Sequence, residues 1–505
     1  MSGSSAGFGL LSRVIVALAV LLALVATADA LASAAWQEWN DGRLAPSAAL
    51  LHGYELYSGD GEGPILGHVY GPISAFYYVP AALLSGTPDV AVMLGSVMSL
   101  VAFLLPAALL LRRGAAGAHI PCLAGLSGIW LYIFPTAMFL GPGFNIHADA
   151  PALGFGALAC HLVTRPGAES DRWSYPAAAL AVFLSVGSKQ VMFALPVAIA
   201  AYIGLTQGSR VLRRFLAAQM VVGVAGLIAV AGLVDFRAML FNMVSVPARH
   251  PWRGEGGIAA IVQACRDLAP RILPSVAVIA AALVLATATK RLRREDWRTW
   301  LGRNDWVLLI LVGLANVPAT LLGRVKVGGS LNALAFCGYF LVVGAALALV
   351  EARHEERPVA GHPAGYWARL MLLACLVVLL VVNLPVLRSA GGIPARIAGN
   401  PERAAYAFAR AHQERIYYPF HPLVTLMSEG RAYHFSDAIY ARELGGFTVT
   451  PRQFADGLPA DLEIVATHRS YEDYSLRFLA DFEVAAPIAE LPGWRVFRRR
   501  GDPRR

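Results

Sequence analysis

Long apolar runs separated by short polar connectors dominate most of the chain. A bilayer core is about 30 Å thick and takes roughly 20 apolar residues per helix, so each run is a candidate membrane span. Eleven spans are predicted, at residues 14–34, 90–111, 120–140, 151–163, 175–186, 191–205, 215–234, 272–289, 306–322, 331–350 and 370–387. The fourth, fifth and sixth are short for a span. The pattern predicts an all-α polytopic membrane domain over residues 1–387.

Two stretches are too long to be simple connectors. Residues 35–88 begin with Leu44, Ala48, Leu51 and Leu56 at near-helical spacing, which predicts an amphipathic helix, and end in the interface-like run HVYGPISAFYYVPAAL. Residues 388–505 alternate the helix-like PERAAYAFARAH with the strand-like RIYYPF, LEIVATHR and WRVFRR. This alternation predicts a small C-terminal α/β domain.

Composition and charge agree with a membrane location. The chain is 57% hydrophobic and 15% charged, with a mean hydropathy of +0.56, which exceeds the usual values for a water-soluble globule. Basic residues gather in connectors on one side of the predicted spans, at positions 13, 112–113, 165–172, 210–214, 290–295 and 351–357. The positive-inside rule then predicts a plasma (inner) membrane protein with a cytoplasmic N-terminus and an extracytoplasmic C-terminal domain. A cleavable signal peptide is the alternative for the first span, since ATADALASAA follows it.

Several kinds of site are not indicated. The five cysteines show no CxxC pairing, and His421, His434 and His468 are too far apart in the sequence to predict a metal site. No GxGxxG or GxxxxGK[ST] motif occurs where a soluble nucleotide fold would use it, which disfavours ATP-driven transport. The net charge of +9 is explained by the membrane topology, and no nucleic-acid partner is predicted.

Two carboxylates fall at the predicted outer surface of the membrane. Asp41 follows the first span and Asp149 opens the fourth, within HADAPALGFGALA. A charge at this depth is costly unless it faces a polar cavity, so each is a candidate functional group. The alternatives are a solvated loop residue for Asp41 and a helix N-cap for Asp149, which precedes Pro151.

Three outward cations run against the positive-inside bias. Lys189 lies between two apolar stretches in GSKQ, and Arg324 and Lys326 lie in GRVKVGG. Such groups suit an anionic lipid headgroup, which they would hold by charge-assisted hydrogen bonds. The alternative is snorkelling, or pairing with the acids of the same surface.

The order of these features resembles the GT-C superfamily of polytopic glycosyltransferases, which use polyprenyl-phosphate-linked sugars. This group contains protein O-mannosyltransferases and lipid A aminoarabinose transferases. The resemblance is carried by the acidic loop leading into AALLHGYELY and YGPISAFYYVPAAL, by HADAPALGFGALA, by GSKQ, and by GGSLNALAFCGYFLVVGAAL. The outward C-terminal domain also fits, so the resemblance covers nearly the whole chain.

The resemblance implies roles for individual residues. Asp41 matches the aspartate that acts near the acceptor hydroxyl, with Glu38 as the alternative, because this chain reads EWND where relatives have a DE pair. Asp149 matches the second outer acid. Lys189 matches a donor-phosphate contact. The further candidates are Arg324 and Lys326 for phosphate, and His147, Tyr70 and Asn332 for substrate.

The sequence thus predicts an inverting hexosyl- or pentosyltransferase that moves a sugar from a polyprenyl-phosphate carrier to a glycan, lipid or protein acceptor among membrane lipids. A carboxylate would take the acceptor's proton while cations hold the departing phosphate. No cofactor is required, although two acids and a histidine leave a divalent metal open. The alternatives are a transporter or lipid-carrier flippase, with polar groups along a path through the bundle, and a non-catalytic glycan-binding subunit.

Overall fold

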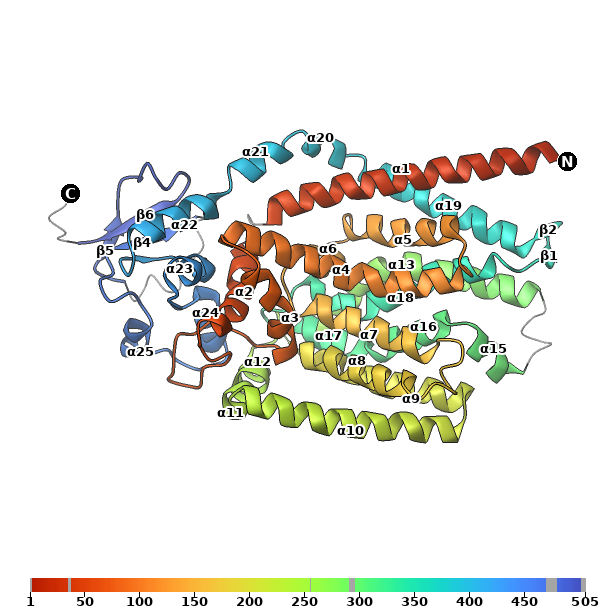
Figure 1. Cartoon of the computed structure of the whole chain (residues 1–505), viewed down its shortest axis with the longest axis horizontal. Helices are drawn as coiled ribbons and strands as arrows, with labels where there is room; N and C mark the ends of the chain where they lie inside the picture. The colour runs from red at the N-terminus through yellow and green to blue at the C-terminus, as the bar shows by residue number, and fades with distance from the viewer. Residues whose placement is uncertain (1, 35–37, 255, 290–295, 469–478, 501–505) are drawn as a thin grey trace.

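A bundle of apolar helices carries a smaller domain at one end (Figure 1). The structure, a computed structural model, describes residues 2–34, 38–254, 256–289, 296–468 and 479–500. The predicted basic connector 290–295 lies outside the described residues. The N-terminus, the β1–β2 hairpin and α15 lie at the end of the bundle away from the C-terminal domain (Figure 1).

Seven helical segments of the described residues are long and apolar enough to cross a membrane. They are α1 (Ser2–Ala34), α4 (Pro88–Gly114), α10 (Ser209–Leu233), α13 (Gly257–Ala288), α16 (Trp306–Ala315) with α17 (Val317–Val325), η3 (Leu331–Leu334) with α18 (Ala335–Ala352), and α19 (Ala364–Asn383). Three shorter apolar segments are α7 (Asp149–Val163), α8 (Ser174–Ser188), and η1 (Gln190–Ala194) with α9 (Leu195–Thr206). The predicted multi-pass helical class is confirmed, and the number of eleven spans stays a prediction.

The third predicted span is not one straight helix. It is divided into α5 (His119–Ile133) and α6 (Ala137–Phe144), whose axes differ by 104°. Pro135 lies at the break, and proline removes a backbone donor and clashes with the preceding turn. The prediction of a continuous helix over 120–140 is therefore wrong. After the bend, α6 leads into the segment that carries His147 and the start of α7.

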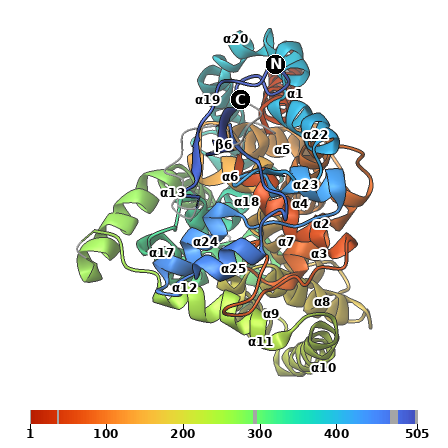
Figure 2. The same cartoon turned by 90° about the vertical axis from the view of Figure 1, so that its left-hand side faces the viewer.

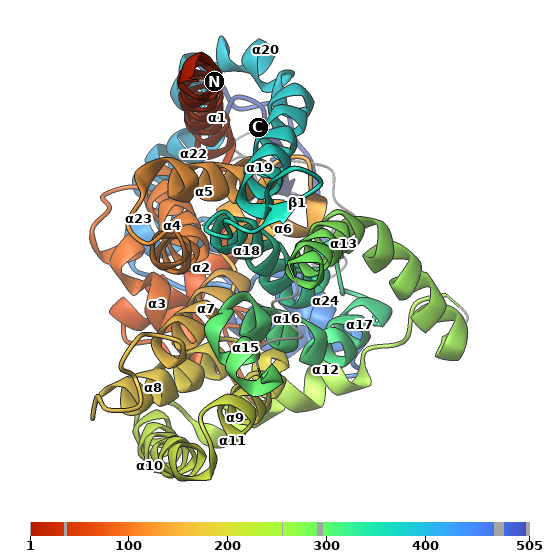
Figure 3. The same ribbon diagram turned by 90° about the vertical axis from the view of Figure 1, so that its right-hand side faces the viewer.

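The bundle is packed around α18, which runs through its middle (Figure 3). This helix contacts α13, α16, α19, α5 and α4 along its length. Peripheral helices instead expose apolar side chains, such as Met220 and Ile228 on α10 and Leu273 and Val284 on α13. Fully apolar surfaces of this kind suit lipid contact.

The first outer loop folds into α2 (Glu38–Leu51) and α3 (Pro72–Leu83) between the bundle and the C-terminal domain (Figure 1). A helix forms here as predicted, but it begins before Leu44 and ends at Leu51, so Leu56 lies beyond it, and most of its residues are buried on all sides rather than on one face. Leu44 and Ala48 are buried, while Leu51 is exposed.

The C-terminal domain combines short helices with a small sheet, as predicted, and covers one end of the bundle (Figure 2). Its strands pair in the order β3-β4-β6-β5, with β3 parallel to β4 and the other pairs antiparallel. Its elements are α20 (Val386–Ala390), α21 (Ile393–Ala398), α22 (Pro401–Ala411), β3 (Ile416–Tyr417), α23 (Pro422–Glu429), α24 (Ser436–Leu444), α25 (Pro451–Asp456), β4 (Ile464–Thr467), β5 (Phe482–Val484) and β6 (Arg495–Arg499). The remaining short elements of the chain are α11 (Phe236–Leu240), η2 (Phe241–Ser245), α12 (Val246–Arg249), α15 (Trp297–Arg303), β1 (Pro358–Val359) and β2 (His362–Pro363).

The C-terminal domain is joined to the bundle by apolar packing and by charge. Leu423 and Leu426 of α23 share a buried cluster with Leu44 of α2. Arg403 of α22 donates to the carboxylate of Asp89 at the start of α4, at 2.6 Å. The C-terminal domain therefore forms one wall of the space between itself and the end of the bundle.

Candidate active site between the bundle and the C-terminal domain

A cavity of about 1510 Å³ lies where the bundle, the first outer loop and the C-terminal domain meet. Its polar side is lined by His68, Tyr70, His147, Lys189 and Gln190. Its volume exceeds the usual range of small-molecule pockets, about 300–1,000 Å³, so it can hold a ligand larger than a single sugar.

Another part of the cavity wall is apolar. It is lined by Phe144 and Leu140 of α6, Leu322 of α17 and Leu331 of η3. Both α6 and α17 contact η3, and the Leu140 and Leu322 side chains are 41% and 55% exposed. The apolar wall therefore continues onto the outer surface of the helices, where an acyl or isoprenoid chain would lie.

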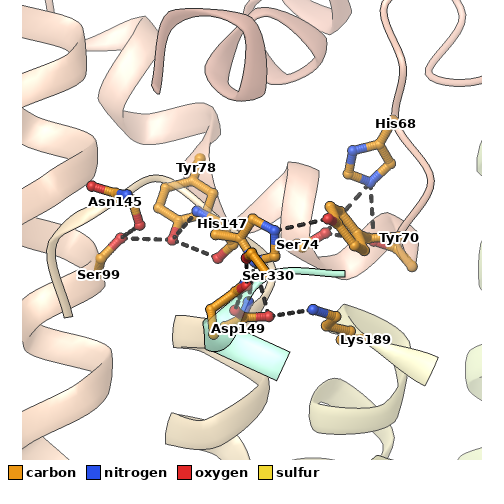
Figure 4. Close-up of polar contacts among 12 residues, drawn as sticks. His68, Tyr70, Ser74, Tyr78, Ser99, Asn145, His147, Asp149, Lys189 and Ser330 are labelled. Atoms are coloured by element: carbon orange, nitrogen blue, oxygen red, sulfur yellow. Dashed lines mark hydrogen bonds and ion pairs between the residues drawn. The ribbon is translucent and has the colours of Figure 1, made fainter. Parts of the chain in front are cut away.

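Asp149 is the centre of a hydrogen-bonded cluster beneath the cavity (Figure 4). Its carboxylate is fully buried, and it accepts from Lys189 Nζ at 2.5 Å and from Asn332 Nδ2 at 2.6 Å. His147 Nδ1 lies 2.9 Å from the same carboxylate. A buried charge is stable only with such partners, so the cluster holds Asp149 and Lys189 in fixed positions.

His147 links this cluster to the first outer loop. Burial lowers the pKa of His147 to about 4, so the ring is neutral at pH 7. Its Nδ1 faces both the Asp149 carboxylate, at 2.9 Å, and the Asp149 N–H, at 3.3 Å, while Nε2 lies 2.8 Å from the Tyr70 hydroxyl. The Tyr78 hydroxyl donates to the His147 carbonyl at 3.0 Å, which fixes the backbone (Figure 4).

Lys189 is positioned by the junction between α8 and η1. Its backbone is extended, with φ −147° and ψ 123°, so the side chain leaves the helix axis toward the cavity. The ammonium lies 4.9 Å from the ring centroids of both Tyr70 and Phe336. The Gly71 N–H donates to the Ser188 carbonyl at 3.2 Å, which holds the Tyr70 segment against this junction. Five of the predicted residues, Asp149, Lys189, His147, Tyr70 and Asn332, are thus brought together.

The other predicted cations lie apart from this cluster. Lys326 lines the cavity and donates to the carbonyls of Ala248 and His250, at 3.0 and 2.8 Å. Arg324 pairs with Asp267 at 2.7 Å and, among the described residues, is not part of the cavity lining. The structure therefore brings Lys326, but not Arg324, to the cavity.

Asp41 lies on the face of α2 that turns away from the cavity. Trp39, Gly42, Arg43 and Pro46 line the cavity, whereas Asp41 is fully buried toward α23, where its Oδ1 accepts from the Leu423 N–H at 2.9 Å. Burial, and then the neighbouring Glu402 carboxylate, raise the pKa of Asp41 well above its usual value. The structure does not bring Asp41 to the Asp149 cluster. Glu38 begins α2, and its side chain lies outside the part of the chain that is described.

Three charged residues of the cavity were not predicted from the sequence, and one of them, Asp29 of α1, is paired with Arg396. Arg43 lines it from α2, and Asp437 lines it from the first turn of α24. Burial raises the pKa of Asp437 to about 6, and the charge of Arg43 opposes this shift. The spacing of Arg43 from Trp39, one helical turn, was a sequence feature that could have indicated a shared face. The approach of Asp437 depends on domain docking, which local patterns do not encode.

A second group of ionisable residues lies on the far side of α2. Asp41, Glu402 and His421 are all buried, and one ligand atom from each lies within 4.8 Å of the others. Such a group could hold a metal ion. The sequence did not predict a metal site from His421, His434 and His468, and in the structure His421 meets two acids instead.

Comparisons with known proteins support the fold. No protein-family model and no curated protein matches the sequence. A solved structure of ArnT from Cupriavidus metallidurans bound to undecaprenyl phosphate is similar over 95% of this chain and 97% of its own, with a TM-score of 0.55 and 14% identity. The apo form of the same protein matches with a TM-score of 0.50 at 13% identity, over 98% of each chain. At these identities the likeness shows a common fold, and the predicted polytopic helical architecture with a small C-terminal α/β part is confirmed.

Proposed function

We propose that the chain is an inverting glycosyltransferase of the plasma membrane, which transfers a sugar from a polyprenyl-phosphate carrier to an acceptor at the extracytoplasmic face. The observation that carries this proposal is one cavity lined both by apolar side chains and by the cationic side chains of Lys189, Lys326 and Arg43. A lipid-linked sugar phosphate has the same two parts. ArnT, whose fold is similar, is bound to undecaprenyl phosphate.

Each part of the donor has a matching wall. The isoprenoid lies along Leu140, Leu322 and Leu331, where the lining continues onto the lipid-facing surface. The phosphate lies near Lys189 and Lys326, which supply charge-assisted hydrogen bonds. Because the same Lys189 is paired with Asp149, the carboxylate holds the ammonium in place rather than meeting the sugar directly.

The reaction needs a base and a stabilised leaving group. The acceptor hydroxyl oxygen bonds to the anomeric carbon as the bond from that carbon to the phosphate oxygen breaks, and the phosphate keeps the electron pair. Asp437 takes the hydroxyl proton in this proposal, because it faces the cavity and a pKa of about 6 makes it a stronger base than an ordinary aspartate. Asp41 is the base predicted from the resemblance, and the transfer experiment compares Asp41 with Asp437.

The supporting roles follow from position. Arg43 faces the cavity from α2 and adds positive charge near the phosphate. Tyr70 and His147 shape the polar wall, and Asn332 fixes the second oxygen of Asp149. In the proposed membrane orientation the N-terminus is cytoplasmic and the C-terminal domain is extracytoplasmic.

Binding tests the donor assignment without knowledge of the acceptor. Purified chain is titrated with undecaprenyl phosphate and measured by native mass spectrometry, comparing wild type, Lys189→Met and the exposed control Arg237→Met. A charge-assisted contact is worth about 1.5–3 kcal/mol, so Lys189→Met should weaken binding roughly tenfold to a hundredfold. Equal affinity in all three proteins would reject the phosphate role of Lys189.

Transfer tests the base. Membranes containing wild type, Asp437→Asn, Asp41→Asn or the exposed control Asp461→Asn are given a panel of radiolabelled polyprenyl-phosphate sugars, and label moving out of the donor lipid is counted. We expect Asp437→Asn to lose about 10²-fold or more of the rate, the usual contribution of a general base. Full activity in Asp437→Asn would reject Asp437 as the base, and loss in an Asp41→Asn protein that keeps the thermal stability of wild type would return the role to Asp41. Binding without turnover by every donor would instead indicate a non-catalytic or flippase function.

A further inference from the structure

The buried group on the far side of α2 joins three separate segments of the chain. Asp41 comes from α2, Glu402 from the first turn of α22, and His421 directly precedes α23. Asp41 and Glu402 are 0% exposed and His421 is 3% exposed. These segments are the contact between the first outer loop and the C-terminal domain.

The carboxylates of this group are incompletely satisfied. Both oxygens of Glu402 and the Oδ2 atom of Asp41 are buried without a hydrogen-bond partner among the described residues. Arg403, which follows Glu402 in the chain, is turned to Asp89 instead. Two carboxylates so close in a dry interior repel each other, and an unpaired buried charge is strongly destabilising.

The distances in the group suit a shared ion better than hydrogen bonds. His421 Nδ1 lies 3.5 Å from Glu402 Oε1 and 4.0 Å from Asp41 Oδ2, both longer than a normal hydrogen bond. Ligand atoms held at about 2.1 Å around a tetrahedral ion are about 3.4 Å apart. The remaining oxygen of Asp41 is fixed by the Leu423 N–H, and the His421 ring packs at a steep angle against Trp494, with centroids 5.0 Å apart.

We propose that Asp41, Glu402 and His421 bind one divalent transition-metal ion of the zinc class, which fastens the C-terminal domain to α2. The chemistry of the donors sets the class. An imidazole nitrogen with two carboxylates suits zinc, whereas magnesium and calcium take oxygen ligands alone. The ion is structural, since the site faces away from the cavity that holds Lys189, and it is separate from glycosyl transfer.

Metal content provides the first test. Full-length chain carrying a tag without histidines is purified in detergent, incubated with equimolar Zn²⁺, Mn²⁺, Mg²⁺ or Ca²⁺, desalted and measured by mass spectrometry of the elements. We expect about one zinc ion per chain in wild type and in the exposed control Glu490→Gln, and a loss of about tenfold or more in Glu402→Gln. Wild type that stays metal-free, or Glu402→Gln that keeps a full equivalent, would overturn the proposal.

Thermal unfolding provides the second test and does not use activity. A chelator should lower the unfolding midpoint of wild type and Glu490→Gln, added zinc should restore it, and neither should move the midpoint of Glu402→Gln. If Glu402→Gln does not fold, the wild-type titration decides, because a midpoint insensitive to both chelator and zinc contradicts the site. If wild type binds a full equivalent of zinc but transfers no sugar, the proposed function is rejected and the metal site stands.

Discussion

The ion pair between Asp149 and Lys189 can be tested by a double-mutant cycle. The variants are Lys189→Met, Asp149→Asn and the two combined. Methionine keeps the unbranched length of the lysine stem, so it preserves contact with the Tyr70 and Phe336 rings. The cycle therefore isolates the charge rather than the packing.

The magnitude follows from the burial of both groups. Asp149 is fully buried and Lys189 is 9% exposed, and breaking such a pair costs about 3–5 kcal/mol. Asn332 and His147 would still contact Asp149 in Lys189→Met, which places the loss near the lower value, about 3 kcal/mol. Since the double variant leaves no unpaired charge, it should lose clearly less than the sum of the single variants, with a coupling of about 2 kcal/mol.

The assay is unfolding by denaturant in detergent micelles, followed by tryptophan fluorescence, with undecaprenyl-phosphate binding measured on the same preparations. Losses that simply add, within about 0.5 kcal/mol, would refute the argument that the two charges depend on each other. A double variant that regains stability but not lipid binding would separate the structural role of Lys189 from its phosphate role.

Three further predictions concern the cavity and the domain contact. Because the base must be ionised, the rate of wild-type transfer at limiting substrate should fall as the pH drops through about 6, the pKa of Asp437. The Asp437→Asn variant should be slow and should lack this pH dependence. A pH–rate profile of both proteins tests the prediction. In Gly71→Ala the new Cβ would lie 1.9 Å from the Gly187 carbonyl oxygen, so we expect a loss of about 1–3 kcal/mol in stability and weaker lipid binding, unlike Gly86→Ala, where the space is open. Arg403→Ala should leave the Asp89 carboxylate short of a partner and speed proteolysis of the domain contact, whereas Arg410→Ala on the same helix should not; equal cleavage would count against the tie.

The helical class and most of the candidate cluster could be predicted from the sequence because the relevant patterns are local. Apolar run length predicts spans, and a charge at the edge of such a run indicates a polar cavity. Asp149 and Lys189, 40 positions apart, are in contact as ion partners. The short α6 was missed because Pro135 bends a run that is continuous in composition.

The position of Asp41 could not be predicted because it depends on which face of α2 meets which surface. Trp39 and Arg43 lie one turn apart on the cavity face, and Asp41 lies between them in sequence but on another side of the helix. The sequence indicates a helix here, but the face that carries Asp41 is covered by Leu423 and its neighbours, nearly four hundred positions away. The role of Asp437 depends on the same docking.

The two covered faces of α2 make the membrane domain and the tail inseparable in practice. A chain shortened after Leu387 would lose Leu423 and Leu426 from the apolar cluster that holds Leu44 and Ala48, and would lose Asp437 from the cavity wall. Swapping tails between distant relatives should therefore fail unless this helix is exchanged along with them. Any movement of the C-terminal domain would also displace Arg43, because α2 packs against that domain. The helix would thus couple the C-terminal domain to the lipid-linked substrate.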